Sequence, residues 1–269
     1  MSDETLVERK DGLVTVTFNR PDKKNAINAE NWQALDAVLQ EMTNNPGDRA
    51  LLLTGAGGNF SAGADLSGGL SSGDSNRSSL TGRERQLVLW EMRTIGETVN
   101  RLHRLPKPTM AAVDGVCIGV GLGIALACDL IVASDRARFC QIFVKRGLAL
   151  DGGTSWSLPR QIGLRRAKQM ALFGDMIDAS TALEWGLVNE VVPAEKLTDV
   201  AGSWADRLAN GPTTALSLSK RLLDGSESLT FEQAVEEEAR AQHIAFTTAD
   251  MAEGMIAFAE RRDPHFKGS

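Results

Sequence analysis

The sequence predicts an α/β fold followed by a helical C-terminal region. Short apolar runs typical of buried strands, at residues 50–54, 109–113 and 130–133, alternate with segments of helical periodicity. From Arg165 onward almost every segment has helical periodicity, and only residues 187–192 look extended. Strands that alternate with helices, followed by a run of helices, indicate an α/β core with helices that pack on it or on another subunit.

The first elements are expected to be a hairpin and a capped helix. Residues 6–8 and 13–18 are β-like and flank an Asp-Gly turn, which is a hairpin signal. Asn28 is a candidate N-cap for the helix that follows. A longer amphipathic helix is expected from Arg83 to about Arg104, where prolines stop it. The first helix has its apolar residues on one face: Trp32, Leu35, Leu39 and Met42.

The second half of the chain is predicted to contain one more extended piece, residues 137–143, and then helices. We expect residues 1–200 to form the core that carries the site and residues 201–269 to form a helical C-terminal region. No sequence repeat of fixed period is visible. The predicted helices span residues 165–173, 179–185, 194–209, 213–223, 231–246 and 249–260.

The composition excludes several classes of function. With 269 residues, 42% hydrophobic and 24% charged, the chain is expected to fold around one sizeable core. Its net charge of -6, with no basic run containing aromatic residues, argues against a nucleic-acid partner. Cys117, Cys128 and Cys140 have no CxxC spacing, which fits a reducing, cytoplasmic setting, and two of them lie inside apolar runs, where a cysteine is expected to be a small buried side chain. Asp129 interrupts the longest apolar stretch, and the N-terminus has no apolar leader, so no membrane segment is expected.

Three glycine-rich segments, at residues 55–66, 114–123 and 147–163, follow predicted strands or extended pieces. The second leads into a helix that is apolar all round and must therefore be buried. Amides in the first turn of a helix have no intrahelical partner and lie at its positive end, so they suit developing negative charge. The serine- and glycine-rich residues 67–82 are expected to form a mobile loop or lid.

Common catalytic motifs are absent. The glycines at 119–123 lack the GxGxxG spacing of a dinucleotide site, no GxxxxGK[ST] is present, and Ser61 has no GxSxG elbow. The three histidines fall in helical or tail segments away from the glycine-rich segments, and they form no metal-ligand spacing, so no metal site is predicted. These histidines are His103, His243 and His265.

Three aspartates accompany the glycine-rich segments. Asp65 and Asp129 suit structural roles, as a cap after the first turn and at the end of the buried helix. Asp151 lies between Leu150 and Gly152 in an apolar neighbourhood. Two interpretations stay open for it: proton transfer by a carboxyl group whose pKa burial has raised, or capping.

The motifs FSAGADL (residues 60–66) and AAVDGVCIGVGLGIALACD (residues 111–129) resemble those of the crotonase, or enoyl-CoA hydratase/isomerase, family. The likeness runs from NRPDKKNAIN (residues 19–28) to EGMIAFAERRDPHFKG (residues 253–268). It implies a crotonase-like spiral of ββα repeats whose C-terminal helices mediate homotrimers or hexamers. It also implies acyl-CoA thioesters as ligands, with coenzyme A as part of the substrate and no separate cofactor.

The resemblance implies roles for particular residues. The amides of Ala64 and Val120 would polarise the thioester carbonyl and stabilise an enolate, although family members often have glycine where Val120 stands. The remaining residues carried over are implied to bind substrate: Lys24 and Ala26 near the CoA nucleotide, Ala62, Asp65 and Leu66 along the pantetheine or acyl portion, and Phe258 and Lys267 near the adenine or its phosphate.

Departures from the family pattern bear on the reaction. Hydratases of the family use two glutamates, and the matching positions here are Gly123 and Phe143. Asp151, in LALDGG, resembles the acting aspartate of the family's phenylacetate-pathway isomerases, dihydroxynaphthoyl-CoA synthases and chlorobenzoyl-CoA dehalogenases. The first hypothesis is therefore double-bond isomerisation of an unsaturated acyl-CoA with Asp151 as acid and base. The alternatives are a hydratase, lyase or thioester hydrolase that uses Asp151, and an acyl-CoA binder without catalysis.

Overall fold

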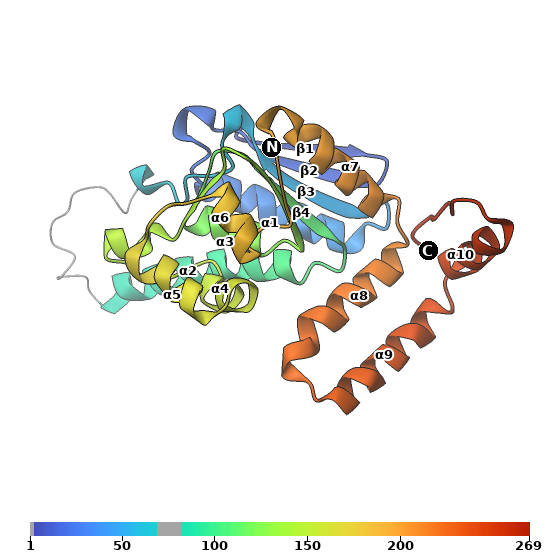
Figure 1. Cartoon of the computed structure of the whole chain (residues 1–269). Helices are drawn as coiled ribbons and strands as arrows, with labels where there is room; N and C mark the ends of the chain where they lie inside the picture. Colours follow the sequence, from blue (N-terminus) through green and yellow to red (C-terminus); the bar gives the residue numbers. More distant parts are fainter. Residues whose placement is uncertain (1–2, 69–81) are drawn as a thin grey trace.

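A six-stranded sheet forms the centre of the protein, with helices on both faces (Figure 1). The computed structural model describes residues 3–68 and 82–269, and all structural statements concern these residues. The two N-terminal strands are antiparallel, which confirms the predicted hairpin, and every other neighbouring pair is parallel. The strands, in sheet order, are β1 (Thr5–Lys10), β2 (Leu13–Phe18), β3 (Ala50–Gly55), β4 (Thr109–Val113), β6 (Leu130–Ser134) and β9 (Glu190–Val192).

A second, three-stranded sheet consists of β5 (Val116–Ile118), β7 (Arg138–Cys140) and β8 (Ile177–Asp178). Two isolated parallel bridges prolong it, because Ser61 pairs with Cys117 and Ile27 pairs with Ala64. This sheet therefore brings the first and second glycine-rich segments side by side.

The extended piece predicted at residues 137–143 is wrong beyond Cys140. Residues Ile142–Arg146 form a 3-10 helix that ends at Gly147, whose φ of 66° is left-handed. The amide of Gly147 donates to the carbonyls of Phe143 and Val144. A glycine that adopts this conformation ends a helix readily, and a local apolar pattern does not reveal the closure.

The first helix, α1 (Ala29–Asn44), begins as predicted at Asn28. The side chain of Asn28 accepts from the amide of Asn31, and the side chain of Asn31 accepts from the amide of Asn28, forming a capping box. The four apolar residues predicted on one face of the helix are all buried. The longer amphipathic helix is α2 (Gly82–His103).

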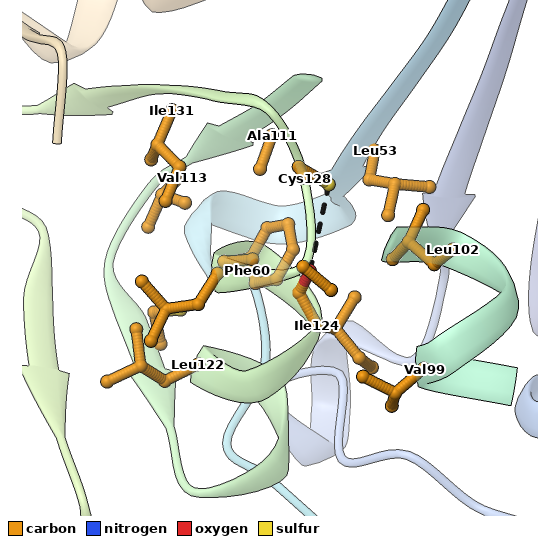
Figure 2. Close-up of a cluster of buried hydrophobic side chains, with 14 of the residues drawn as sticks. Leu53, Phe60, Val99, Leu102, Ala111, Val113, Leu122, Ile124, Cys128 and Ile131 are labelled. Carbon is orange, nitrogen blue, oxygen red and sulfur yellow. Dashed lines mark hydrogen bonds between the residues drawn. The ribbon is translucent and has the colours of Figure 1, made fainter. Parts of the chain in front are cut away.

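The helix predicted to be apolar all round is α3 (Val120–Leu126), and every one of its residues is buried. Figure 2 shows Leu122 and Ile124 of α3 among core side chains from β3 and β4, including Leu53 and Val113. The thiol of Cys128 lies 3.6 Å from the carbonyl of Ile124. All three cysteines are free and buried, including the two that the sequence places in apolar runs.

The third glycine-rich segment contains a helix that its sequence pattern does not separate from the turn. This helix, α4 (Thr154–Ile162), starts directly after Gly153 and ends at Gly163. It is followed by α5 (Leu164–Phe173) and α6 (Ala179–Trp185), close to their predicted bounds.

The C-terminal helices divide into one that covers the sheet and three that extend away from it. Helix α7 (Leu197–Ala209) buries Leu197, Ala201 and Ala205 against Leu52 and Met110 on the second face of the sheet. The boundary predicted at residue 200 thus falls inside α7. The other three helices extend to one side of the molecule (Figure 1): α8 (Thr213–Gly225), α9 (Phe231–Ala245) and α10 (Ala249–Glu260).

Polar contacts tie this extension to the core. The guanidinium of Arg49, just before β3, donates to the hydroxyl of Thr213 at 3.0 Å and to the carbonyls of Gly211 at 2.6 Å and Phe266 at 3.2 Å. Lys220 of α8 pairs with Asp129 at 3.0 Å. Among the described residues, no helix is long and apolar enough to cross a membrane.

Candidate active site

The first two glycine-rich segments are joined by backbone hydrogen bonds. The amide of Phe60 donates to the carbonyl of Asp114 at 2.7 Å, and the amide of Ser61 donates to that of Val116 at 2.9 Å. In return, the amide of Ile118 donates to the carbonyl of Ser61 at 2.9 Å. The backbone after Ser61 and the backbone after Ile118 therefore leave the small sheet at the same edge.

The amide of Ala64 is left without an acceptor among the described residues by the hydrogen bonds of its neighbours. The amide of Ile27 donates to the carbonyl of Gly63, and the amide of Asp65 donates to the carbonyl of Ile27, both at 2.8 Å. Amides alternate in direction along an extended chain, so that of Ala64 points away from Ile27. No described residue accepts a hydrogen bond from it. Gly63 has a φ of 96°, and a Cβ there would lie 2.9 Å from the carbonyl oxygen of Ile118, so the turn requires glycine.

Val120 is the first residue of α3, and its amide also has no acceptor among the described residues. A first-turn amide has no partner within its helix. The preceding amide, of Gly119, is taken by the carbonyl of Cys140 at 2.8 Å. Because a Cβ on Gly63 would reach within 4.0 Å of the Gly119 Cα, the segments that carry the amides of Ala64 and Val120 are neighbours.

Asp151 lies on the third glycine-rich turn, which packs on α3. Its Oδ1 accepts from the amide of Gly152 at 2.6 Å, and its main-chain carbonyl accepts from the hydroxyl of Thr154 at 2.7 Å. The half-buried carboxyl group has a second oxygen, Oδ2, to which no described residue donates. A Cβ on Gly152 would lie 3.2 Å from Cγ2 and 3.8 Å from Cα of Val120. The structure thus brings the turn that carries Asp151 next to the residue whose amide opens α3.

The two positions that match hydratase glutamates have no titratable side chain. The Phe143 ring borders the start of α3, because a Cβ on Gly119 would lie 3.8 Å from its Cζ. Gly123 lies against the backbone of Gly152. Asp151 is therefore the carboxylate that adjoins Val120 through the Gly152 contact.

Five of the predicted substrate-binding residues lie around Ala64: Lys24, Ala26, Ala62, Asp65 and Leu66. The amide of Ala62 donates to the carbonyl of Lys24 at 2.9 Å, which joins the two loops that carry them. The Lys24 side chain is exposed, and Leu66 is 36% exposed. Their roles in binding stay predictions.

The Asp65 carboxylate is already engaged within the protein. It accepts from the amide of Ser67 at 2.9 Å and from its hydroxyl at 2.5 Å, and it pairs with Arg20 at 2.7 Å. The hydrogen bonds from Ser67 and the charge of Arg20 hold the pKa of Asp65 well below its usual range. Arg20 also donates to the carbonyl of Ala26 at 2.6 Å, so the pair fastens both loops beside Ala64.

Phe258 and Lys267 are not brought to this site within one chain. Phe258 is 83% exposed on α10, at the opposite end of the molecule from residues 64–68, which precede the grey trace in Figure 1. Lys267 lies near α10 as well, because its amide donates to the carboxylate of Asp250 at 2.7 Å. The predicted lid, residues 67–82, falls mainly on residues 69–81, outside the described part of the chain.

A cavity of about 710 Å³ lies among helices α2, α3, α4 and α8, and both Gly123 and Gly152 line it. The prediction that His103 lies away from the glycine-rich segments is wrong. Its ring stacks edge-on against Trp156, with centroids 5.2 Å apart, and both line the cavity with Asp224. Packing around Asp224 raises the pKa of its carboxyl group, an effect that the charges of His103 and Lys220 oppose. Sequence spacing gave no sign of this cluster, because three distant helices supply it.

Residues 8–269 match the sequence model of the enoyl-CoA hydratase/isomerase family. The chain belongs to that family. The match confirms the resemblance stated above, and the helices and parallel sheet are those of the crotonase fold.

Relatives within the enoyl-CoA hydratase/isomerase family differ in reaction. The 1,2-epoxyphenylacetyl-CoA isomerase of Escherichia coli is 38% identical over 96% of this chain and 95% of its own length. The short-chain-enoyl-CoA hydratase of Clostridium acetobutylicum is 33% identical over 96% of this chain and 95% of its own length. The crystal structure of an enoyl-CoA hydratase/isomerase from Cupriavidus metallidurans superposes with a TM-score of 0.88, at 30% identity, covering 100% of this chain and 97% of that one.

Replacing Asp65 with Asn is expected to lower the free energy of unfolding at pH 7 by about 1–3 kcal/mol, because the pair with Arg20 loses its charge. The pKa of Asp65 in the folded protein is below its ordinary value of 3.8. Its stabilisation is therefore present above that value and is lost as the pH falls toward the folded pKa. Urea unfolding at pH 7 and pH 3 measures this difference.

The difference in free energy of unfolding between wild type and Asp65→Asn is expected to be smaller at pH 3 than at pH 7. Asp22→Asn, at an exposed residue of a neighbouring turn, serves as the matched control and should show no such decrease. A difference of equal size at both pH values would contradict the stabilising role of the Asp65 charge.

Proposed function

We propose that the protein moves the double bond of a 3-enoyl-CoA to the 2,3 position, with Asp151 as acid and base. The observation that carries the proposal is the position of Asp151 on a turn that packs against Val120, with one carboxylate oxygen free of described donors. Gly123 and Phe143 offer no second carboxylate. Coenzyme A enters as part of the substrate, and the proposal needs no separate cofactor.

The reaction requires one group that takes a proton and one that stabilises an oxyanion. The Asp151 carboxylate takes a proton from C2, and the electron pair of the broken bond moves through the thioester to its carbonyl oxygen, giving a dienolate. The amides of Ala64 and Val120 donate to that oxygen. Asp151 then returns the proton at C4, the double bond forms between C2 and C3, and the carboxylate is regenerated. One such donor typically lowers the barrier by about 3 kcal/mol.

Two alternatives are kept. In the first, Asp151 activates water or attacks the acyl group, so that the protein is a hydratase, lyase or thioester hydrolase. The similarity to the clostridial hydratase favours this class, and release of a 3-hydroxyacyl-CoA or a covalent acyl-aspartate would identify it. In the second, the protein binds acyl-CoA without catalysis. The absence of glutamates at positions 123 and 143 is the reason to consider it.

The Asp151→Asn variant is expected to lose at least about 100-fold in turnover of a 3-enoyl-CoA, because the general base is removed. Its affinity for the thioester should change little, since the amides of Ala64 and Val120 remain. Formation of the conjugated 2-enoyl product is followed by ultraviolet absorbance, and loss of the C2 proton by mass spectrometry in deuterated water. Asp199→Asn, on the exposed side of α7, is the control. Turnover near the wild-type value in Asp151→Asn would refute the proposed role.

In this proposal the CoA site takes residues from a second copy of the chain, because α10, which carries Phe258, lies at the opposite end of the molecule from residues 64–68 (Figure 1). Helices α9 and α10 expose apolar side chains that a second copy would cover, and a homotrimer or hexamer in which α10 of one copy adjoins the CoA of the next accounts for both facts. The exposed apolar residues include Phe231, Val235, Ile244, Met255, Ile256 and Phe258.

Phe258→Ala and Lys267→Ala are expected to raise KM for an acyl-CoA about tenfold while kcat stays the same. These side chains would contact only the nucleotide end of the substrate, which takes no part in the reaction. The same acyl group on pantetheine, which lacks the nucleotide, should show no change in KM. Sedimentation of the wild type at micromolar concentration should give a trimer or hexamer. A monomer, or an equal effect on the pantetheine thioester, would contradict the arrangement.

The cavity behind Gly123 and Gly152 is a suitable place for the far end of the acyl group, because Gly152 borders both the cavity and Asp151. Gly96 of α2 lines this cavity, and a Cβ there meets nothing within 4 Å. Gly96→Leu should therefore fill space without disturbing the helix.

Gly96→Leu is expected to lower kcat/KM for long acyl chains at least tenfold and to leave short chains unaffected. Comparison of a ten-carbon with a six-carbon 3-enoyl-CoA measures this preference, and Gly96→Ala controls for the loss of glycine itself. An equal loss for both chain lengths would remove the cavity from the substrate path.

A further inference from the structure

Two glycines of α3 contact the two turns that carry the proposed catalytic groups. A Cβ on Gly121 would lie 2.7 Å from Cβ and 3.1 Å from the carbonyl oxygen of Ser61. A Cβ on Gly123 would lie 2.7 Å from the carbonyl oxygen and 3.1 Å from Cα of Gly152. A Cβ cannot lie 2.7 Å from another atom without a shift of the neighbour, so at both places the backbone of α3 is packed as closely as glycine alone permits.

The contact at Gly121 controls the turn of Ala64. Ser61 is fully buried, and its hydroxyl oxygen accepts from the amide of Gly63 at 3.1 Å. The carbonyl of Ser61 also accepts from the amide of Ile118. A displacement of Ser61 would therefore also displace Gly63 and the next residue, Ala64.

The contact at Gly123 controls the turn of Asp151. Gly152 has a φ of 61° and its amide donates to the Asp151 carboxylate, so a shift of the Gly152 backbone would also shift the donor that holds the carboxylate. On its other side Gly152 touches Val120. The same short helix thus bears the Val120 amide and holds the turn that aims Asp151.

We propose that Gly121 and Gly123 are positioning residues that set two separate distances. Gly121 sets the distance between the amides of Ala64 and Val120. Gly123 sets the distance between the Asp151 carboxylate and the oxyanion. The inference rests on the proposed function, because the groups being positioned are its acid/base and its amide pair. It adds that each distance is set by the close contact of one glycine of α3 with a neighbouring turn and can be disturbed alone. Displacement of a reacting group by about 1 Å can reduce the rate about 100-fold.

The test compares Gly123→Ala with Gly121→Ala, using Gly202→Ala of α7 as the matched control, because a Cβ on Gly202 meets nothing within 4 Å. Two quantities are measured with full-length protein. One is the rate of C2 proton exchange of a 3-enoyl-CoA in deuterated water. The other is the infrared shift of the carbonyl stretch of a bound 2-enoyl-CoA labelled at that carbonyl, which reports polarisation by the amides and needs no turnover.

Gly123→Ala is expected to lower exchange about 10- to 100-fold while the carbonyl shift stays as in the wild type. Gly121→Ala is expected to reduce the carbonyl shift as well as the exchange rate. Gly202→Ala should match the wild type in both. Identical profiles for the two α3 variants, or full exchange in Gly123→Ala, would overturn the inference.

A second variant covers the case in which the overpacked Gly123→Ala does not fold. Val120→Ala retains the amide and removes the side chain that touches Gly152 from the other side, so it loosens the Asp151 turn without a clash. Its exchange rate should fall while the carbonyl shift is retained, and an unchanged exchange rate would again overturn the inference. If Asp151→Asn keeps wild-type exchange, the proposed function itself fails; if Asp151→Asn is inactive and these variants are not affected, only the positioning role fails.

Discussion

Close backbone packing of α3 against two glycine turns is the constraint on which the candidate site depends. Gly121 meets Ser61 and Gly123 meets Gly152 at distances that leave no room for a Cβ. Because α3 is buried on all sides, its position is fixed by the core in Figure 2 and is not free to adjust to the turns. The turns must therefore conform to the helix, which is how one short element organises amides and a carboxylate from three parts of the chain.

Charge has a supporting role at the edge of this arrangement. The Arg20–Asp65 pair, in which both side chains are 10% exposed, links the strand end after β2 to the loop of Ala64. A partly buried pair with additional hydrogen bonds loses less to solvent screening than an exposed one. Asp65, carried over as a ligand residue by family resemblance, is thus occupied by protein contacts that hold the Ala64 loop in place.

Most helices and strands could be predicted from the local sequence pattern, and the contacts between them could not. The hairpin, the capping box at Asn28 and the buried helix α3 follow from turn chemistry, a side-chain oxygen at an N-cap and an all-apolar run. Strand β5 was missed, because a three-residue strand is defined by a partner strand distant in sequence. The 3-10 helix at residues 142–146 was missed because a local apolar pattern does not reveal its closure at left-handed Gly147. His103 was placed wrongly for the same reason, since its neighbour Trp156 is on another helix.

The sequence by itself determined the family and the fold class, and it indicated Asp151 as the candidate carboxylate, because motifs and residue types are local properties. Only the tertiary structure decided that the amides of Ala64 and Val120 emerge from neighbouring backbone and that the turn of Asp151 adjoins Val120 through Gly152. It also decided that α10, which carries Phe258, lies at the opposite end of the molecule from residues 64–68 (Figure 1). Those facts depend on packing between segments tens of residues apart, and no local pattern of hydrophobicity or turn residues encodes the distance between such segments.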